Sequence, residues 1–232
     1  MKDLLEPLLY PQNIFLYGLL IACIFYRKKG LWFLLLGFYL VGNTYFANLV
    51  RSHYAGQIGG TSLAQSNSTY VVLGCGGSAE ALPACARARL DRLGQSLAGQ
   101  TAAVIITTRH CQPYQDYLLG QQPQPLVIDC VDAGDNTYQE FSHLSKRLSK
   151  QQPLQFVTSD FHGWRVTKLI RYHQLNAGLS TVSSQTFRPL NCNLNCMFIV
   201  NLSNYDLYSK LIAEYASYAV WRASVIAGVW QS

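Results

Sequence analysis

Leu-Gln-Phe-Val-Thr-Ser-Asp-Phe-His-Gly-Trp-Arg, residues 154–165, is the stretch that decides how this chain folds. Its apolar half has the composition of a buried strand and stops abruptly at two hydroxyls, Thr158 and Ser159. His162 and Arg165 follow at short intervals. Ligands of open parallel sheets sit beyond the carboxyl ends of the strands, so this strand end predicts a site. The plain alternative is a hydroxyl cap on the next helix, with a solvated His and Arg.

Outward from this stretch, short β-branched runs alternate with helix-like segments. Strands are predicted over residues 70–74, 103–108, 126–130 and 155–159, and helices over residues 84–97, 114–119, 137–148 and 164–175. This alternation is typical of βαβ units, and it predicts an α/β, Rossmann-like fold with a mostly parallel sheet and helices on both faces. Two more strands, over residues 180–184 and 197–200, and a final helix over 205–230 that packs on the sheet complete the prediction.

The N-terminal region differs in composition from the rest. Only 13% of all residues are charged, against roughly 25% in soluble domains, and the deficit is concentrated in two apolar segments, residues 8–26 and 31–50. Each approaches the roughly 20 residues of a membrane-spanning helix. The basic turn Arg27-Lys28-Lys29-Gly30 between them predicts a transmembrane helical hairpin over residues 1–50 with its turn in the cytoplasm. A cleaved signal peptide fits less well, because the positive charge follows the apolar run.

The remaining chain divides at a polar segment. Residues 51–68 are rich in Gly, Ser, Gln and Asn and read as a linker, so that residues 69–232 form the α/β domain outside the cytoplasm. The net charge of +6 is spread along the chain rather than gathered into a stripe. Nucleic acid is therefore not expected as a partner, whereas the bilayer is.

The cysteines fit an exported domain. Cys23 lies in the first apolar segment, and an even set of six remains: Cys75, Cys85, Cys111, Cys130, Cys192 and Cys196. Fifteen pairings exist for six cysteines, and Cys192–Cys196 is the first expected disulfide because a three-residue spacer can close when the chain turns. Buried free thiols are the alternative. No metal site is predicted, since Cys-x-x-Cys is absent and no His lies near Cys192.

A glycine-rich turn follows the first predicted strand. In Gly74-Cys75-Gly76-Gly77-Ser78-Ala79, glycines let the backbone approach a ligand and aim N–H groups at an anion. The segment matches G-x-G-x-x-A, but no acidic residue stands at the end of the second strand, where a dinucleotide-binding protein carries one. A plain tight turn is the alternative.

Polar residues also follow the third strand. Asn136 and Thr137 precede or open a helix, where capping alone explains them. Glu140, one turn further, is predicted to act as a general base or to hold His162 in one tautomer. A Ser159–His162–Asp160 triad is not favoured, because Gly-x-Ser-x-Gly and an oxyanion loop are absent.

These residues make up one predicted cleft at the carboxyl edge of the sheet, with Arg89 reaching in from its helix. His162 is assigned to proton transfer, Arg89 and Arg165 to anion binding, and Thr158 or Ser159 to hydrogen bonding the ligand. The catalytic candidates are His162 and Glu140, and the ligand-binding candidates are Gly74, Gly76, Gly77, Arg89, Asn136, Thr137, Thr158, Ser159 and Arg165.

Taken together, the motifs resemble the ElyC/SanA/YdcF family. The resemblance rests on Val-Val-Leu-Gly-Cys-Gly-Gly (residues 71–77), Arg-Leu (89–90), Asn-Thr-Tyr-Gln-Glu (136–140) and Val-Thr-Ser-Asp-Phe-His-Gly-Trp-Arg (157–165). Two spans before the domain are similar to the ElyC arrangement. Where members usually have Ser/Thr-Gly-Gly after the second strand, this chain has Thr107-Thr108-Arg109, which substitutes a guanidinium for backbone N–H groups.

The resemblance implies a Rossmann-like domain, anchored in the inner membrane and facing the periplasm, that serves envelope and peptidoglycan biogenesis. The expected function is to bind, and to hydrolyse or transfer, a phosphorylated lipid-carrier-linked intermediate. A non-catalytic sensor or scaffold for envelope-synthesis proteins is the first alternative, since the same residues would serve it. A nucleotide- or S-adenosylmethionine-binding domain is the second, which applies if the domain is cytoplasmic. No cofactor is assigned.

Overall fold

The computed structural model describes residues 10–58, 68–97, 101–122, 124–132, 134, 136–192 and 194–228. The chain divides into two compact units. One comprises Met1–Gln57 and Gln185–Tyr215, and the other comprises Ile58–Ser184 and Ala216–Ser232. The division differs from the predicted one, in which residues 69–232 form a single domain, because residues 185–215 belong with the N-terminal helices.

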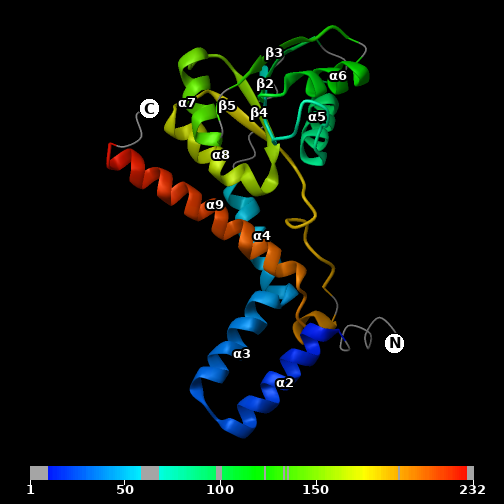
Figure 1. Cartoon of the computed structure of the whole chain (residues 1–232), viewed down its shortest axis with the longest axis vertical. Coiled ribbons are helices and arrows are strands. Elements are labelled where there is room, and N and C mark those ends of the chain that lie inside the picture. Colours follow the sequence, from blue (N-terminus) through cyan, green and yellow to red (C-terminus); the bar gives the residue numbers. More distant parts are fainter. Residues whose placement is uncertain are drawn as a thin grey trace. The chain divides into compact units, whose positions relative to one another are not determined.

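The larger unit is built on a five-stranded sheet (Figure 1). Its strands are β1 (Thr69–Leu73), β2 (Ala103–Thr107), β3 (Val127–Val131), β4 (Leu154–Ser159) and β5 (Ala177–Val182). Their order is β3-β2-β1-β4-β5, and every neighbouring pair is parallel. The α/β, Rossmann-like prediction is thereby confirmed.

Helices cover both faces of this sheet (Figure 1). Helices α5 (Ala84–Leu97) and α6 (Cys111–Gln121) pack on one face, while α7 (Thr137–Arg147) and α8 (Asp160–Tyr172) pack on the other with the end of α9 (Ser203–Ile226). All five residues of β1 are buried, which suits a central parallel strand covered on both sides. Each face holds its own apolar cluster, one around Phe156 and one around Leu90.

The strand order creates a switch point between β1 and β4. The chain leaves β1 toward β2 on one side, whereas β4 pairs with β1 on the other. The connections that follow β1 and β4 therefore run to opposite sides of the sheet and leave a crevice at their carboxyl ends, where open α/β sheets bind ligands.

Two predicted helices begin earlier than expected. Helix α8 starts at Asp160 instead of Trp164, so that His162 lies in its first turn, and α6 starts at Cys111. The predicted strand over residues 197–200 does not form. Its first part belongs to the 3₁₀ helix η2 (Leu194–Met197), and Val200 makes only an isolated bridge with Asn43.

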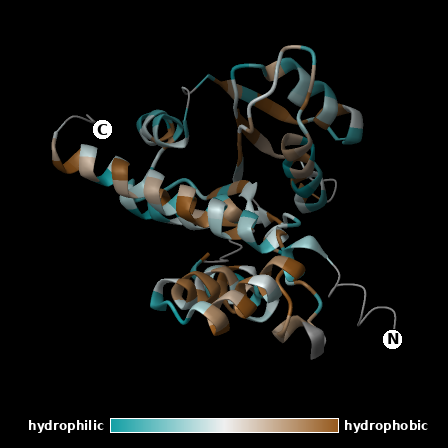
Figure 2. Ribbon diagram, turned by 60° about the horizontal axis from the view of Figure 1, so that its bottom comes forward, coloured by the Kyte–Doolittle hydropathy of each residue, from teal (hydrophilic) through white to brown (hydrophobic). Residues whose placement is uncertain are grey.

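The smaller unit contains a pair of helices, α2 (Pro11–Tyr26) and α3 (Lys29–Gly42), joined by a tight basic turn (Figure 1). Pro11 opens α2, a position where the missing N–H costs nothing. Hydrophobic residues predominate along both helices (Figure 2). Within the described residues, no helix has both the length and the apolar character needed to cross a membrane.

Asn43 divides the predicted second span. Its side-chain oxygen accepts hydrogen bonds from the backbone N–H groups of Tyr45 and Phe46, so Asn43 ends α3 and caps α4 (Thr44–Gln57). Its amide nitrogen donates to the carbonyl oxygens of Cys196 and Met197. Residues 31–50 therefore belong to two helices, because the buried Asn43 side chain caps α4 and also binds the carbonyl groups of residues 196 and 197.

The predicted linker over residues 51–68 is also revised. Arg51 is buried on α4, and its guanidinium donates to the Thr186 carbonyl, the Asn48 side chain and the Asn204 side chain at 2.9–3.0 Å. These contacts make residues 51–57 helical and tie residues 185–204 to the same unit. The rest of the predicted linker, residues 59–67, lies outside the described residues.

Three disulfides join the six cysteines that follow the hairpin: Cys75–Cys85, Cys111–Cys130 and Cys192–Cys196. The expected Cys192–Cys196 pair is therefore confirmed, and Cys23 is a buried free thiol. The first two disulfides flank loops at the carboxyl edge of the sheet, because each has one cysteine just beyond or at the end of a strand.

Candidate functional site

A cavity of about 430 Å³ opens at the carboxyl edge of the sheet. Residues that follow β1, β2, β3 and β4 line it together: Gly74, Cys75, Gly76, Gly77, Arg89, Thr107, Thr108, Arg109, His110, Gly134, Asn136, Thr137, Glu140 and His162. Eight of the predicted site residues are among them: Gly74, Gly76, Gly77, Arg89, Asn136, Thr137, Glu140 and His162. The volume lies in the usual range for small-molecule sites.

The glycine-rich turn forms one wall. A Cβ atom on Gly74 would lie 2.0 Å from the Thr107 carbonyl oxygen, so only glycine lets β1 end this close to β2. Gly76 and Gly77 have φ angles of +70° and +117°, which side chains rarely tolerate. Within the described chain their N–H groups donate no hydrogen bond, so both remain available to an anion.

Contacts from β2 and α6 fix the shape of this turn. The Thr107 hydroxyl accepts from the Gly74 N–H at 2.9 Å. The buried Tyr114 hydroxyl accepts from the Cys75 N–H at 3.2 Å and donates to the Gly76 carbonyl at 3.0 Å. The Cys75–Cys85 disulfide closes the loop behind it. The wall is therefore held before any ligand arrives.

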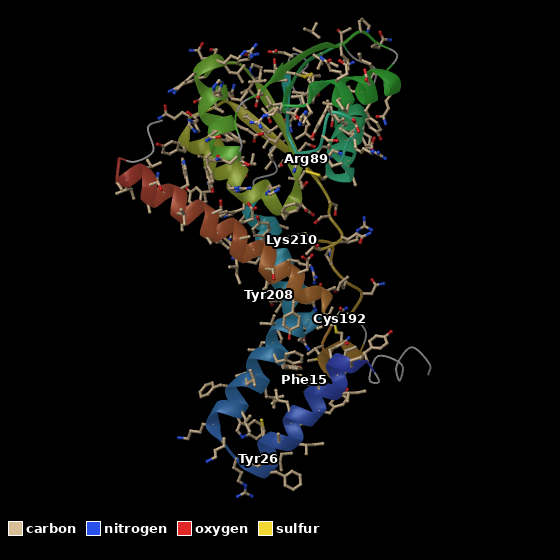
Figure 3. The ribbon with its side chains drawn as sticks, in the orientation of Figure 1. Phe15, Tyr26, Arg89, Cys192, Tyr208 and Lys210 are labelled. Atoms are coloured by element: carbon tan, nitrogen blue, oxygen red, sulfur yellow. A yellow bond between two sulfur atoms is a disulfide. The ribbon has the colours of Figure 1, made fainter. Side chains whose placement is uncertain are left out.

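Arg89 lies at the base of the cavity, where α5 meets the strand ends (Figure 3). Its Nη1 donates to the carbonyl oxygens of Leu73 and Gly74 at 2.6 and 2.7 Å, and its Nε and Nη2 donate to the Ser159 hydroxyl at 3.3 and 3.1 Å. Four of its five N–H groups are thus used by the protein. Burial lowers the pKa of Arg89 to about 10. Arg89 chiefly joins β1 to β4 and adds a positive charge to the floor.

Glu140 is a buried carboxyl group on the first turn of α7. Burial raises its pKa to about 7, and this shift is opposed by hydrogen bonds from the Thr107 hydroxyl and the Gly74 N–H and by the charges of Arg89 and Arg165. Near neutral pH the group therefore exchanges a proton readily, which suits general acid–base work.

His162 is oriented by Arg165 rather than by Glu140. Arg165 Nη2 lies 2.9 Å from His162 Nδ1, and because a guanidinium can only donate, Nδ1 accepts and the neutral ring carries its proton on Nε2. Arg165 in turn donates to the Ser217 hydroxyl at 3.2 Å and stacks over the Tyr138 ring. The sequence predicted both residues, but not their pairing.

Asn136 and Thr137 begin α7 beside the cavity. The Asn136 side-chain oxygen accepts from the N–H groups of Tyr138 and Gln139, so it caps the helix. Gly134, with φ of +108°, precedes this cap and also lines the cavity.

Three predicted site residues do not line the cavity: Thr158, Ser159 and Arg165. Adjacent strand residues point to opposite faces, so Thr158 and Ser159 cannot both reach one ligand. Ser159 faces α5 and accepts from Arg89, while Thr158 is buried, and its hydroxyl has no hydrogen-bond partner in the described structure. Arg165 acts through His162.

The second strand contributes more than the predicted site contained. Thr108, Arg109 and His110 line the cavity in the connection from β2 to α6. The sequence has Thr107-Thr108-Arg109 in place of Ser/Thr-Gly-Gly, which predicted a guanidinium at this position, and Arg109 does line the cavity. Nothing in the sequence pattern indicated His110.

The G-x-G-x-x-A match does not have the geometry of a dinucleotide site. In that motif the last positions open a helix whose N-terminus faces the phosphates, whereas α5 begins only at Ala84, after residues 80–83. Among the described residues, no group of three or more His, Cys, Asp or Glu side chains could hold a metal ion.

Comparisons with protein-family models, with curated proteins and with solved structures found no match to this chain. The residues of the cavity are therefore the basis on which a function can be proposed.

Proposed function

We propose that this chain is an inner-membrane protein of envelope biogenesis whose periplasmic α/β unit binds a phosphorylated, lipid-carrier-linked intermediate and hydrolyses or transfers its phosphate. The observation that carries the proposal is the content of the carboxyl-edge cavity. Two glycines, a buried guanidinium and an oriented imidazole line the same space as a carboxyl group with a pKa of about 7. Oriented N–H groups and cations favour a phosphate group.

The contacts support a division of roles within this cavity. His162 offers its Nε2 proton as a hydrogen-bond donor to a phosphate oxygen, because Nδ1 already accepts from Arg165. Glu140 takes the proton of the attacking water or hydroxyl oxygen. The new bond joins that oxygen to phosphorus, and the leaving oxygen departs with the electrons of the broken bond. Arg89 stabilises the resulting negative charge from the floor.

The anchoring part of the proposal is supported by the surface of α2 and α3. Large apolar side chains on both helices are exposed, including Phe25 (79%) and Phe33 (75%). With 16 and 14 residues the helices rise about 24 and 21 Å, against a hydrocarbon core of roughly 30 Å. Arg27, Lys28 and Lys29 can extend their side chains to the far headgroups, and short helices are accommodated by local thinning of the bilayer. We therefore propose that the two helices cross a thinned bilayer with this turn in the cytoplasm.

Equilibrium binding of inorganic phosphate to the full-length protein in detergent tests the site. His162→Ala is expected to weaken binding about tenfold, the usual loss for a hydrogen bond to a charged group. His143→Ala is the matched control, because His143 is exposed on α7 and does not line the cavity. Absence of phosphate binding by the unaltered protein, or equal binding by the His162 variant, would contradict the proposal.

Turnover separates the enzyme from the scaffold. Release of phosphate from farnesyl diphosphate is expected for the unaltered protein, with slower release from farnesyl phosphate, whose alkoxide leaving group needs a proton. Glu140→Gln is expected to bind inorganic phosphate and to release none from either compound. Binding without any turnover of either compound would favour the non-catalytic role.

Topology is tested independently. A reporter that is active only in the periplasm is expected to work when fused after Ser232. Activity of a cytoplasm-only reporter at the same position would overturn the proposed location.

A further inference from the structure

Arg109 and His110 form a second wall of the cavity, separate from the glycine-rich turn. Both residues line the space and belong to the connection from β2 to α6, whereas the glycines follow β1. More than half of the Arg109 side chain is exposed (62%), so its guanidinium lies in solvent rather than in the floor. The cavity therefore carries cationic or N–H groups on two sides.

The second wall is fixed as firmly as the first. The Thr108 N–H donates to the Val131 carbonyl at 3.1 Å, and the His110 N–H donates to the Thr108 hydroxyl at 3.2 Å. Immediately afterwards, the disulfide between Cys111 and Cys130 ties the start of α6 to β3. A wall that is held by a strand, a turn and a covalent bond can present its side chains without reordering on binding.

One partner of Arg109, the Asp132 carboxylate, is easily displaced. Arg109 Nε lies 3.4 Å from Asp132 Oδ2, and both side chains are more than half exposed. Exposed pairs of this kind contribute little, while a phosphate can accept two parallel hydrogen bonds from one guanidinium. A phosphate group at this wall is therefore a stronger partner than the carboxylate.

The titratable groups limit the chemistry. Among the described lining residues, Glu140 is the only carboxyl group. Glu140 takes the proton of the attacking oxygen, and no second carboxyl group lines the described cavity to protonate an alkoxide leaving group in the same step. A phosphate leaving group needs no proton, because its negative charge is spread over several oxygens and can be neutralised by cations.

We propose that the cavity accepts a diphosphate, with one phosphate at the turn of Gly76 and Gly77 and the other at Arg109 and His110. The inference rests on the proposed function and names its substrate class. In the reaction, water oxygen bonds to the phosphorus at the glycine turn, and its proton goes to Glu140. The bond from that phosphorus to the bridging oxygen breaks, and its electrons leave with the second phosphate, which Arg109 and His110 hold.

The test compares pyrophosphate with inorganic phosphate as ligands of the full-length protein in detergent and chelator-treated buffer. Pyrophosphate is expected to bind at least about tenfold more tightly. The double variant Arg109→Gln, His110→Gln is expected to remove this preference, so that it binds pyrophosphate no more tightly than inorganic phosphate. Arg87→Gln is the charge-matched control, because Arg87 is exposed on α5 and outside the cavity.

The outcomes are distinguishable. Equal affinity for the two ligands, or a preference that survives the double variant, would overturn the diphosphate inference and leave the single-phosphate site standing. Failure of both ligands to bind the unaltered protein would overturn the proposed function itself. A circular dichroism spectrum of each variant checks that the fold is retained.

Discussion

The buried carboxyl group of Glu140 makes the stability of the fold depend on pH. Its pKa is about 7 in the folded chain, against an ordinary value of 4.5, so the folded state keeps a proton that the unfolded state has lost. The favourable contribution of this proton is complete below about pH 4.5 and is lost as the pH rises to about 7. A shift of this size corresponds to about 3 kcal/mol of unfolding free energy.

Urea unfolding at about pH 5 and pH 8 measures this contribution. The unaltered protein is expected to lose more stability on going to the higher pH than Glu140→Gln does, by up to about 3 kcal/mol. The difference between the two proteins removes the contribution of groups that titrate in both. His173, whose pKa is lowered by burial, is one such group. The same pH dependence in both proteins would show that Glu140 is ionised throughout.

Arg89 shows how one guanidinium can replace several backbone bonds. Arg89→Met keeps the length and apolar stem but leaves the carbonyl oxygens of Leu73 and Gly74 without their donor. We expect a loss of about 3 kcal/mol in unfolding free energy, the cost of unpairing buried polar groups. Arg87→Met, at an exposed position on the same helix, is expected to change stability by less than about 0.5 kcal/mol. Similar losses for both variants in urea unfolding would contradict this role.

At this scale the sequence predicted residue types better than partners. The strand end after Phe156 correctly placed His162 near the glycine turn, because parallel strands bring their carboxyl ends to one edge. The alternation of side chains along a strand already excluded a shared role for Thr158 and Ser159. The pairing of Arg165 with His162 depends on rotamers and on Ser217, 52 residues away in sequence, which no local pattern encodes.

Among the elements, the loop closed by Cys75–Cys85 governs the glycine turn. Replacing both cysteines by alanine opens a loop between residues that are 10 apart in sequence, and we expect it to cost about 3 kcal/mol of stability and to weaken phosphate binding about tenfold. Replacing Cys192 and Cys196 by alanine is the control, since that disulfide is far in sequence from every lining residue. Thermal unfolding and phosphate titration measure both effects. Unchanged binding in the first variant would show that Tyr114 alone shapes the turn.

The β and α elements of the larger unit were predictable because each is amphipathic or buried in its own right. The helices of the smaller unit were predicted only in part. Asn43 ends α3 because its amide contacts Cys196 and Met197, and residues 185–204 take their course from Arg51 and Asn204. Such polar contacts join segments about 150 residues apart, so hydrophobic periodicity could not reveal them.

For the whole molecule, the apolar helix pair α2 and α3 offers a test of the proposed membrane anchor. Ile21 is 54% exposed near the middle of α2, and a lysine there would cost about 3 kcal/mol in a bilayer. Ile21→Lys is therefore expected to increase the fraction of protein released from membranes by an alkaline wash. Leu119→Lys changes an equally exposed residue (50%) on α6 and serves as control. Equal retention of both variants would argue against insertion of the hairpin.

The disulfides beside the two walls of the cavity make the site depend on where the chain is oxidised. A newly synthesised chain in a compartment that keeps thiols reduced lacks both disulfides. Its two cavity walls are then held without these covalent bonds. If the chain then moves to an oxidising compartment, the binding geometry is completed only on arrival. The reduced protein is therefore expected to bind phosphate compounds more weakly than the oxidised protein, and its maturation can be followed by the loss of four thiols.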